Sequence, residues 1–328
     1  MEPRRPPRDP PHPRALAAPA RPGLRARRHP AQGGRLSGAP RTGGPAALLE
    51  RLCAASHTAP GPRTLVLVAH PDDEVVGAAG RLRFLPDAHI VHVTDGAPYD
   101  LRDARAAGFR TREAYAAARR EEALAALAVA GIPADRVRCL GRVDQQAAFN
   151  LPGLALELAA LLRALAPDLV LTHPYEGGHP DHDAVAFAAR AALRILARGG
   201  APCPALLELS SYHAGPRGIA TSSFLPFAGY PPRVLALDPA ARLLKRRMLA
   251  CHASQWGTLR WFSIAVESFR VAPPYDFTGP PHEGRLWYER YPLGMTAARW
   301  VRLARSALED LRLEPAREGE EAASCSPS

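Results

Sequence analysis

The sequence predicts an α/β fold in which a mostly parallel sheet carries helices on both faces. Between residues 64 and 197, short runs rich in β-branched residues alternate with longer segments of helical periodicity. This alternation is typical of parallel strands joined by crossover helices. The chain has 328 residues, of which 47% are hydrophobic, so it is long enough to bury a large core in one domain. We therefore expect a Rossmann-like arrangement that binds ligands at the carboxyl ends of its strands.

Each expected strand follows from a short apolar run that stops at a turn signal. The first run, 64–69, is entered from a Pro/Gly-rich stretch and stops at a polar cluster. The second run, 89–94, stops at Asp95-Gly96, and the fourth, 168–172, stops at His173-Pro174. Strands are thus expected at 64–69, 89–94, 136–140, 168–172, 205–213 and 233–237.

Each expected helix follows from apolar residues at helical spacing, with glycine or proline near its end. The longest, 111–130, is followed by Gly131-Ile132-Pro133. The segment 239–251 is basic, and the segment 296–313 is amphipathic and can close the fold. Helices are thus expected at 46–55, 75–85, 111–130, 151–165, 181–197, 239–251 and 296–313.

One domain, residues 46–313, is expected between two tails. Residues 1–45 hold ten arginines and eleven prolines. Few large apolar side chains accompany them, so we expect a disordered Arg/Pro-rich tail. A mis-assigned start codon and an organelle transit peptide are alternatives for this stretch. Residues 314–328 are acidic and rich in small residues, and we expect a second disordered tail there.

Charge and cysteine patterns restrict the expected partners and location. Of the formal net charge of +10, the first 45 residues contribute +8, because their ten arginines stand against Glu2 and Asp9; the rest of the chain carries 10 − 8 = +2. Nucleic acid is therefore not expected as a partner. The five cysteines are scattered, which favours reduced thiols and a cytoplasmic location. No membrane span is expected, and the sequence leaves the oligomeric state open.

A cluster of one histidine and three carboxylates follows the first strand directly. It reads His70-Pro71-Asp72-Asp73-Glu74 and stands at the turn into the helix 75–85. Ionised carboxylates gathered at such a place must be paired or bound to something positive. A divalent metal would neutralise them, and a mixture of histidine and aspartate suits zinc.

A second cluster, His179-Pro180-Asp181-His182-Asp183, follows the fourth strand at the start of the helix 181–197. The two histidines are three residues apart, so one helical turn presents both to the same side. Capping of the helix by an aspartate is the simpler explanation for this cluster alone. Both clusters, however, are expected at one edge of the same sheet, and this favours a shared site.

Together, the motifs Ala69-His-Pro-Asp-Asp-Glu74 and Gly178-His-Pro-Asp-His182 closely resemble those of the PIG-L/LmbE-like zinc-dependent deacetylases. The resemblance extends over about residues 64–269 through weaker matches in the family's order: Thr94-Asp95-Gly96, Arg119-x-x-Glu122, Leu140-Gly141 before Asp144, and Lys245 to Cys251-His252-x-Ser254-Gln255.

The resemblance implies a role for each matching residue. It implies His70, Asp73 and His182 as zinc ligands and Asp72 as the general base. It further implies that His179, oriented by Asp181, helps the tetrahedral intermediate to form and to break down. These roles agree with general chemistry. Three protein ligands are typical of catalytic zinc, a neighbouring carboxylate can accept a proton, and a protonated imidazole can donate one to the leaving amine. Another divalent ion such as Fe²⁺ is an alternative to zinc.

The chain departs from some sugar-deacetylating members of the family. These carry a tyrosine two residues before the first histidine of the second motif, where this chain has Gly177; the nearest tyrosine is Tyr175. Four further expectations concern residues outside the two motifs. We expect His92 as a satisfied core histidine and Arg119 with Glu122 as an i,i+3 ion pair or a substrate contact. His213 and His252 are candidates for the rim of the site. Trp256 and Trp261 are expected in the core, with a platform for a sugar ring as the alternative.

The function expected from the resemblance is zinc-dependent hydrolysis of an N-acyl group, N-acetyl by family analogy, from an amino-sugar-containing small molecule. One alternative is a tailoring amidase that acts on a non-sugar N-acylated metabolite. Another alternative is a metal-free binding or scaffold protein that has kept the fold. A metal assay separates the last alternative from the other two.

Overall fold

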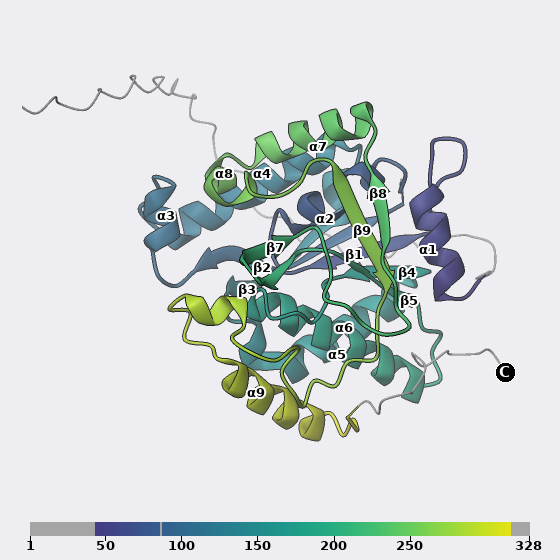
Figure 1. The fold of residues 1–328 in the computed structure, drawn as a ribbon, viewed down its shortest axis with the longest axis vertical. Coiled ribbons are helices and arrows are strands. Elements are labelled where there is room, and N and C mark those ends of the chain that lie inside the picture. The colour runs from purple at the N-terminus through teal and green to yellow at the C-terminus, as the bar shows by residue number, and fades with distance from the viewer. Residues whose placement is uncertain (1–42, 86, 316–328) are drawn as a thin grey trace, which may run out of the picture. The chain divides into compact units, whose positions relative to one another are not determined.

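The computed structural model describes residues 43–85 and 87–315. Apart from a few residues next to the domain, the expected tails 1–45 and 314–328 lie outside these described ranges, and their disorder stays a prediction. A central sheet with helices on both faces dominates the described part (Figure 1).

The observed elements match most of the expected ones within a few residues. The strands are β1 (Thr64–Val68), β2 (His89–Pro98), β3 (Val137–Asp144), β4 (Leu169–Thr172), β5 (Ala205–Leu209), β6 (Tyr212–Gly215), β7 (Gly218–Thr221), β8 (Arg233–Ala236) and β9 (Val266–Val271). The α-helices are α1 (Pro45–Ala54), α2 (Asp73–Leu82), α3 (Arg102–Ala106), α4 (Arg112–Val129), α5 (Leu151–Leu165), α6 (Pro180–Arg198), α7 (Pro239–Cys251), α8 (Trp256–Leu259) and α9 (Ala297–Asp310). Four 3-10 turns complete the list: Ala134–Arg136, Ala147–Asn150, Ala253–Gln255 and Trp287–Arg290.

Seven strands form the main sheet, in the order β3-β2-β1-β4-β5-β9-β8. The first five in this order are parallel, whereas β9 pairs antiparallel with both β5 and β8. From β1 the chain first adds β2 and β3 on one side and then continues with β4 and β5 on the other side. The pair β1 and β4 is therefore the topological switch point, where open α/β sheets bind ligands. The predicted α/β fold with a mostly parallel sheet is confirmed.

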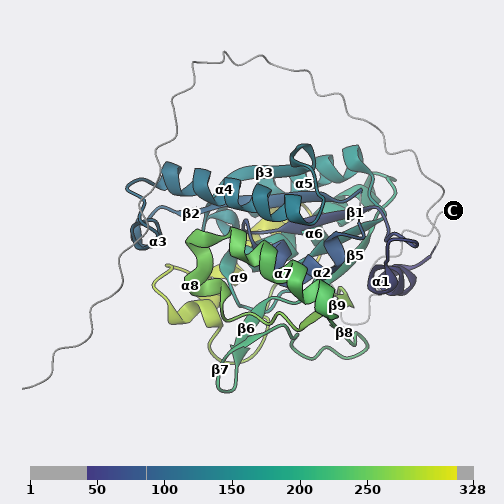
Figure 2. The same cartoon turned by 90° about the horizontal axis from the view of Figure 1, so that it is seen from above.

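The two faces of the sheet are buried by different helices. Along β1, Leu65 and Leu67 join a hydrophobic cluster with residues of α5, α6 and α9. Val66 and Val68 face the opposite way and join a cluster with residues of α1, α2, α4 and α7. Figure 1 shows α2, α4 and α7 on one side of the sheet and α5, α6 and α9 on the other. Figure 2 is seen from the side that carries α4 and α7. Such alternation follows from the two-residue period of a strand.

Two features of the C-terminal half differ from the expectation. The run 205–213 is not one strand, because β5 ends at Leu209 and β6 starts at Tyr212 as part of a separate hairpin with β7. The strand β9 was not predicted, because Glu267 and Arg270 interrupt its apolar pattern. Both side chains are buried, and their charges are matched by Lys245 and Glu208 respectively.

One described segment, Ala147–Leu165, is long and apolar enough by composition alone to cross a membrane. In this fold it comprises a 3-10 turn and α5, and its buried leucines pack in the cluster that α6 and α9 share. Packing against the sheet therefore accounts for its apolar face.

Candidate active site

The two motifs meet at the switch point because each follows one of its two strands. The turn between β1 and α2 carries His70 and Asp72, and α2 starts at Asp73. The loop between β4 and α6 ends at His179, the N-cap residue of α6, whose first turn carries Asp181 and His182. All of these side chains except that of His179 are at most 7% exposed. Residues more than a hundred positions apart thus form one buried polar cluster.

The three expected metal ligands lie in direct contact with one another. His70 Nδ1 lies 3.2 Å from Asp73 Oδ2 and also 3.2 Å from His182 Nε2. His182 Nε2 lies 3.3 Å from Asp73 Oδ1. Two imidazole nitrogens and a carboxylate therefore converge on one point, where a cation would satisfy lone pairs that otherwise face each other.

The outer nitrogen of each of these histidines is held by another polar group. His70 Nε2 lies 3.0 Å from Asp144 Oδ1, and His182 Nδ1 lies 3.4 Å from Ser211 Oγ. Metal-ligating histidines almost always engage their second nitrogen in this way, which fixes the ring and its tautomer. The donor set and its surroundings therefore fit a zinc ion held by His70, Asp73 and His182.

His173, whose direction the sequence left open, points into the site. Its ring stacks on His182 with 3.9 Å between centroids, and its Nε2 lies 3.2 Å from Asp73 Oδ2. The same Nε2 accepts a hydrogen bond from the backbone N–H of Ala69 at 3.0 Å. In the described part of the chain, the groups of side chains that could hold a metal ion are Asp73 with His173 and His182, His70 with His179 and His182, and His70 with Asp144, His179 and Asp181.

Asp72 lies on the other side of the motif, against a buried arginine. Arg119 Nη2 donates to Asp72 Oδ2 at 2.8 Å, and the same guanidinium bonds to the backbone carbonyls of Pro71 and Gly96. Burial raises the pKa of Asp72 to about 7, against the opposing charge of Arg119 and with a further rise from Asp73. A carboxylate with such a pKa is suited to take up and release a proton near neutral pH.

Of the two alternatives for Arg119 with Glu122, the i,i+3 ion pair is wrong. Glu122 accepts hydrogen bonds from the backbone N–H and the hydroxyl of Ser254, at 2.9 and 2.6 Å, while Arg119 pairs with Asp72. Two residues on neighbouring turns of α4 therefore contact different parts of the fold. Arg119 reaches the site, and Glu122 ties α4 to the segment that follows α7.

His179 and Asp181 contact each other through the backbone. The backbone N–H of Asp181 donates to His179 Nδ1 at 3.2 Å, so the proton of a neutral His179 ring is on Nε2, which faces Asp144 at 3.9 Å. The Asp181 carboxylate accepts the backbone N–H groups of Gln145 and Ala147 and lies 3.5 Å from His70 Nε2. Asp181 thus orients His179 through the main chain, while its side chain anchors the loop after β3.

The structure also explains the departure at Gly177. A Cβ at this position would lie 2.8 Å from a side-chain carbon of Leu286, and φ is +69°, so a tyrosine is excluded by both space and conformation. Tyr175 is buried and donates its hydroxyl to the carbonyl of Gly279, away from the motifs. The aromatic ring next to the site belongs to Tyr212 of β6, 5.2 Å from the His182 ring.

The loop before the second motif is held by a buried charge network that the sequence did not reveal. Arg270 of β9 donates to Glu176 Oε1 at 3.1 Å and to Glu208 Oε2 at 2.7 Å. Glu176 also lies 3.3 Å from His213 Nδ1 and accepts the backbone N–H of Leu225. Glu176 directly precedes Gly177 and Gly178, so this network fixes the approach to His179.

The structure also places three histidines that lie outside the two motifs. His92 is buried, and its Nε2 lies 3.0 Å from Glu74 Oε2, so the expectation of a satisfied core histidine is confirmed. The two candidates for the rim of the site are also buried. His213 is 5% exposed, and His252 is completely buried.

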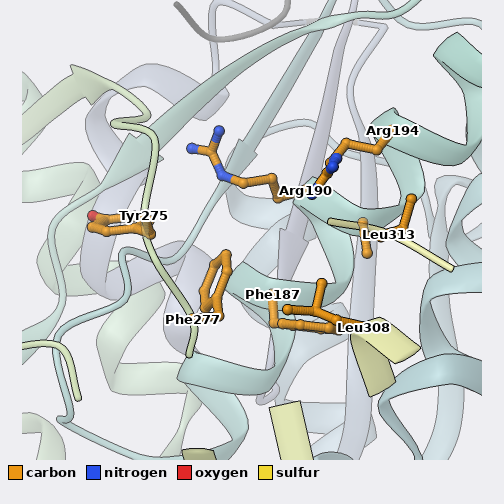
Figure 3. Close-up of a pocket in the computed structure, with 8 residues that line it drawn as sticks. Phe187, Arg190, Arg194, Tyr275, Phe277, Leu308 and Leu313 are labelled. Atoms are coloured by element: carbon orange, nitrogen blue, oxygen red, sulfur yellow. The ribbon is translucent and has the colours of Figure 1, made fainter. Parts of the chain in front are cut away.

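A small cavity elsewhere in the described part is separate from this cluster (Figure 3). It lies along the second half of α6, next to Arg190, and is also lined by the aromatic rings of Tyr275 and Phe277 and by leucines of the C-terminal segment. Its volume of about 20 Å³ is that of a water molecule, and it is too small for a substrate.

Comparison with known proteins identifies the domain that carries these motifs. Residues 65–193 match the family model described as PIG-L, GlcNAc-PI de-N-acetylase. This part of the chain is therefore similar to a PIG-L domain. It includes every residue of both motifs from His70 to Asp183, together with Arg119 and Asp144.

Curated relatives of the chain are described as deacetylases. Over 203 residues it is 29% identical to a "Probable N-acetyl-alpha-D-glucosaminyl L-malate deacetylase 2" of Bacillus anthracis, which covers 59% of this chain and 81% of that protein. Over 138 residues it is 32% identical to the Bacillus cereus protein of the same description, which covers 41% of this chain and 60% of that protein.

Solved structures with a similar fold include the A40926 pseudoaglycone deacetylase Dbv21, with 22% identity and a TM-score of 0.49 over 64% of this chain and 96% of that chain. They also include the N,N'-diacetylchitobiose deacetylase of Pyrococcus horikoshii, with 18% identity and a TM-score of 0.46 over 65% of this chain and 84% of that chain.

Proposed function

We propose that this protein is a zinc-dependent N-deacetylase that hydrolyses the N-acetyl group of an amino-sugar-containing small molecule. The observation that carries the proposal is the convergence of His70, Asp73 and His182 at the switch point, with Asp72 beside them. The family description and both curated relatives are of enzymes that remove N-acetyl groups from glucosamine compounds, and this supports the substrate class.

In the proposed site His70, Asp73 and His182 hold the zinc ion. When bound, zinc supplies Lewis-acid activation of the attacking water and of the amide carbonyl. Every other contribution comes from the protein's own side chains. A metal of similar preference, such as Fe²⁺, fits the same donors, because imidazole and carboxylate ligands suit several first-row ions.

Asp72 acts as the general base in this proposal. Its carboxylate takes a proton from the attacking water and then passes it to the leaving amine, so one group serves both halves of the reaction. Arg119 holds the carboxylate at 2.8 Å and keeps it in one orientation.

His179 acts as a hydrogen-bond donor to the substrate. Its Nδ1 accepts the backbone N–H of Asp181, which leaves Nε2–H directed into the site. A fixed donor aimed at the amide oxygen stabilises the negative charge that develops there. Burial of the cluster excludes water and strengthens each of these interactions.

The proposed location is the cytoplasm. Cys53, Cys139 and Cys251 are free thiols, as is usual for proteins in a reducing compartment.

The test is a screen of purified, zinc-loaded protein against N-acetylglucosamine, its O-glycosides and N-acetylated amino acids. Free amine and acetate are both measured. We expect equal amounts of amine and acetate from the glucosamine compounds, and release at least about 100-fold slower with Asp72→Asn. Release from the amino acids alone would replace the sugar deacetylase by an amidase of another class. No release from any compound would contradict the proposed reaction.

A further inference from the structure

A tyrosine of the hairpin formed by β6 and β7 lies directly against a proposed metal ligand. Tyr212 is the first residue of β6. Its ring contacts the His182 ring edge-on, with 5.2 Å between centroids, and it also contacts the ring of Phe262 at 5.8 Å. The preceding residue, Ser211, has its hydroxyl oxygen 3.4 Å from His182 Nδ1. Two consecutive residues therefore contact His182, and the position of the Tyr212 ring is fixed by two neighbouring rings.

The backbone of Tyr212 also packs against the loop that ends at His179. A Cβ at Gly178 would lie 2.0 Å from the carbonyl oxygen of Tyr212, so only glycine lets the two segments approach this closely. Gly178 directly precedes His179, the proposed hydrogen-bond donor to the substrate. The rings of His179 and His182 are 5.4 Å apart. His179 and Tyr212 are thus both neighbours of the same metal ligand.

The hydroxyl of Tyr212 has no partner in the protein. Within residues 43–85 and 87–315, no residue forms a hydrogen bond with it. By contrast, the hydroxyl groups of Tyr115, Tyr175 and Tyr275 are all hydrogen-bonded, as is usual for tyrosines that are largely buried. The Tyr212 side chain is also partly exposed, whereas His182 and Asp73 are buried. Its hydroxyl is therefore available to a ligand.

Electrostatics place this hydroxyl over the site. Burial raises the pKa of Tyr212, and the charges of Asp73, Asp144 and Asp72 raise it further. These three carboxylates border the site in different places, since Asp73 lies among the metal ligands, Asp144 lies at His70 Nε2, and Asp72 lies at the Arg119 guanidinium. Interactions between charges weaken with distance, so a hydroxyl that is affected by all three lies close to the place where they converge.

We propose that Tyr212 is a further catalytic residue, whose hydroxyl donates a hydrogen bond to the oxygen of the substrate's N-acyl carbonyl. This proposal rests on the proposed function, since it concerns the same reaction. That oxygen gains negative charge when water adds to the carbonyl carbon and loses it when the amine leaves, and fixed donors stabilise this charge. The Tyr212 hydroxyl and His179 Nε2–H form a pair of such donors. Tyr212 keeps its proton throughout, and proton transfer stays with Asp72.

This role differs from support of the metal site in what its loss should change. A donor that acts on developing charge contributes more to the transition state than to the bound substrate, so its removal should lower kcat more than it raises KM. A residue that only holds the His182 ring in place should instead affect zinc content or stability when it is altered.

The experiment removes the hydroxyl and keeps the ring. Tyr212→Phe retains the contacts with His182 and Phe262. Tyr175→Phe is the matched control, because it loses a hydroxyl that is bonded to the carbonyl of Gly279, away from the motifs. For each zinc-loaded protein, kcat and KM are measured with the glucosamine compounds of the screen, beside zinc content and urea unfolding. Calorimetry gives the affinity for glucosamine and for its methylphosphonamidate, a charged tetrahedral analogue of the intermediate.

We expect kcat of Tyr212→Phe to fall by about 10² to 10³, the usual effect of removing one donor to a developing oxyanion. Its affinity for the methylphosphonamidate should fall by about the same factor as its kcat/KM, as expected for an analogue of the transition state. Zinc content, unfolding free energy and the affinity for glucosamine should stay as in the wild type. Tyr175→Phe should keep the wild-type kcat and the wild-type affinity for the analogue.

Hydrolysis by the wild type, with unchanged kcat and analogue affinity in Tyr212→Phe, would reject the role of Tyr212 alone. A fall in kcat matched by an equal loss of zinc would also overturn it, because Tyr212 would then act only through His182. The calorimetric measurement does not depend on turnover. Analogue binding that requires the Tyr212 hydroxyl, without hydrolysis of any compound in the screen, would leave the hydrogen bond standing and reject the proposed function.

Discussion

Replacing Lys245 by methionine should destabilise the protein by about 3 to 5 kcal/mol, the usual cost of removing one partner from a buried ion pair. The side chains of Lys245 and Glu267 are both fully buried, with 3.2 Å between Nζ and Oε1. Lys245 also donates to the carbonyl of Val76 at 2.6 Å, and Glu267 accepts the backbone N–H of Gly80 at 2.9 Å. The pair therefore joins α7 and β9 to α2, the helix that starts at Asp73. Its loss leaves a buried carboxylate with no cation.

The assay is reversible urea unfolding followed by circular dichroism. Arg233 and Glu50 form the matched exposed pair, with side chains 54% and 59% exposed, so Arg233→Met should cost less than about 1 kcal/mol. The double variant Lys245→Met, Glu267→Gln should recover most of the lost stability, because it no longer buries an unpaired charge. If Lys245→Met costs no more than Arg233→Met, the pair does not stabilise α2 as the geometry indicates.

Two further predictions concern the metal and the buried network below the loop of the second motif. Removing metal with a chelator should abolish deacetylation, and Zn²⁺ or another first-row ion should restore it in the usual order of affinity; full activity in metal-free protein would contradict the role of zinc. Burial, against the opposing charge of Arg270, raises the pKa of Glu208 from 4.5 to about 7. The folded state therefore binds more protons than the unfolded state between these values, so Glu208 contributes a loss of stability as pH rises through this window. Urea unfolding of Glu208→Gln should show a smaller fall in unfolding free energy from pH 5 to pH 7 than the wild type, and an unchanged slope would show that Glu208 is ionised throughout.

The meeting of the two motifs could be predicted because it needs only the order of the elements. Each motif follows a parallel strand, and the carboxyl ends of such strands share one edge of the sheet. The side-chain partners could not be predicted in the same way. Whether Arg119 reaches Glu122 or Asp72 depends on the angle at which α4 packs, and helical spacing carries no information on that angle.

The later part of the chain was harder to predict, for a different reason. In β9 the buried charges of Glu267 and Arg270 make a core strand look like a surface segment, since their partners lie far away in the sequence. Trp256 and Trp261 present the opposite case, because composition assigns tryptophan to the core. Trp256 is 58% exposed and Trp261 is 66% exposed, so the expectation that both belong to the core is wrong.

The measurement that tests the central claim most directly is the zinc content of Asp72→Asn and Asp73→Ala beside their turnover. The two carboxylates are adjacent in sequence, but Asp72 pairs with Arg119 whereas Asp73 faces His70 and His182. Asp73→Ala should lose both zinc and activity. Asp72→Asn should keep about one zinc per chain, while its kcat falls by about 10² to 10⁴, the range of a positioned general base. Loss of zinc in Asp72→Asn, with zinc retained in Asp73→Ala, would show that the two roles are reversed.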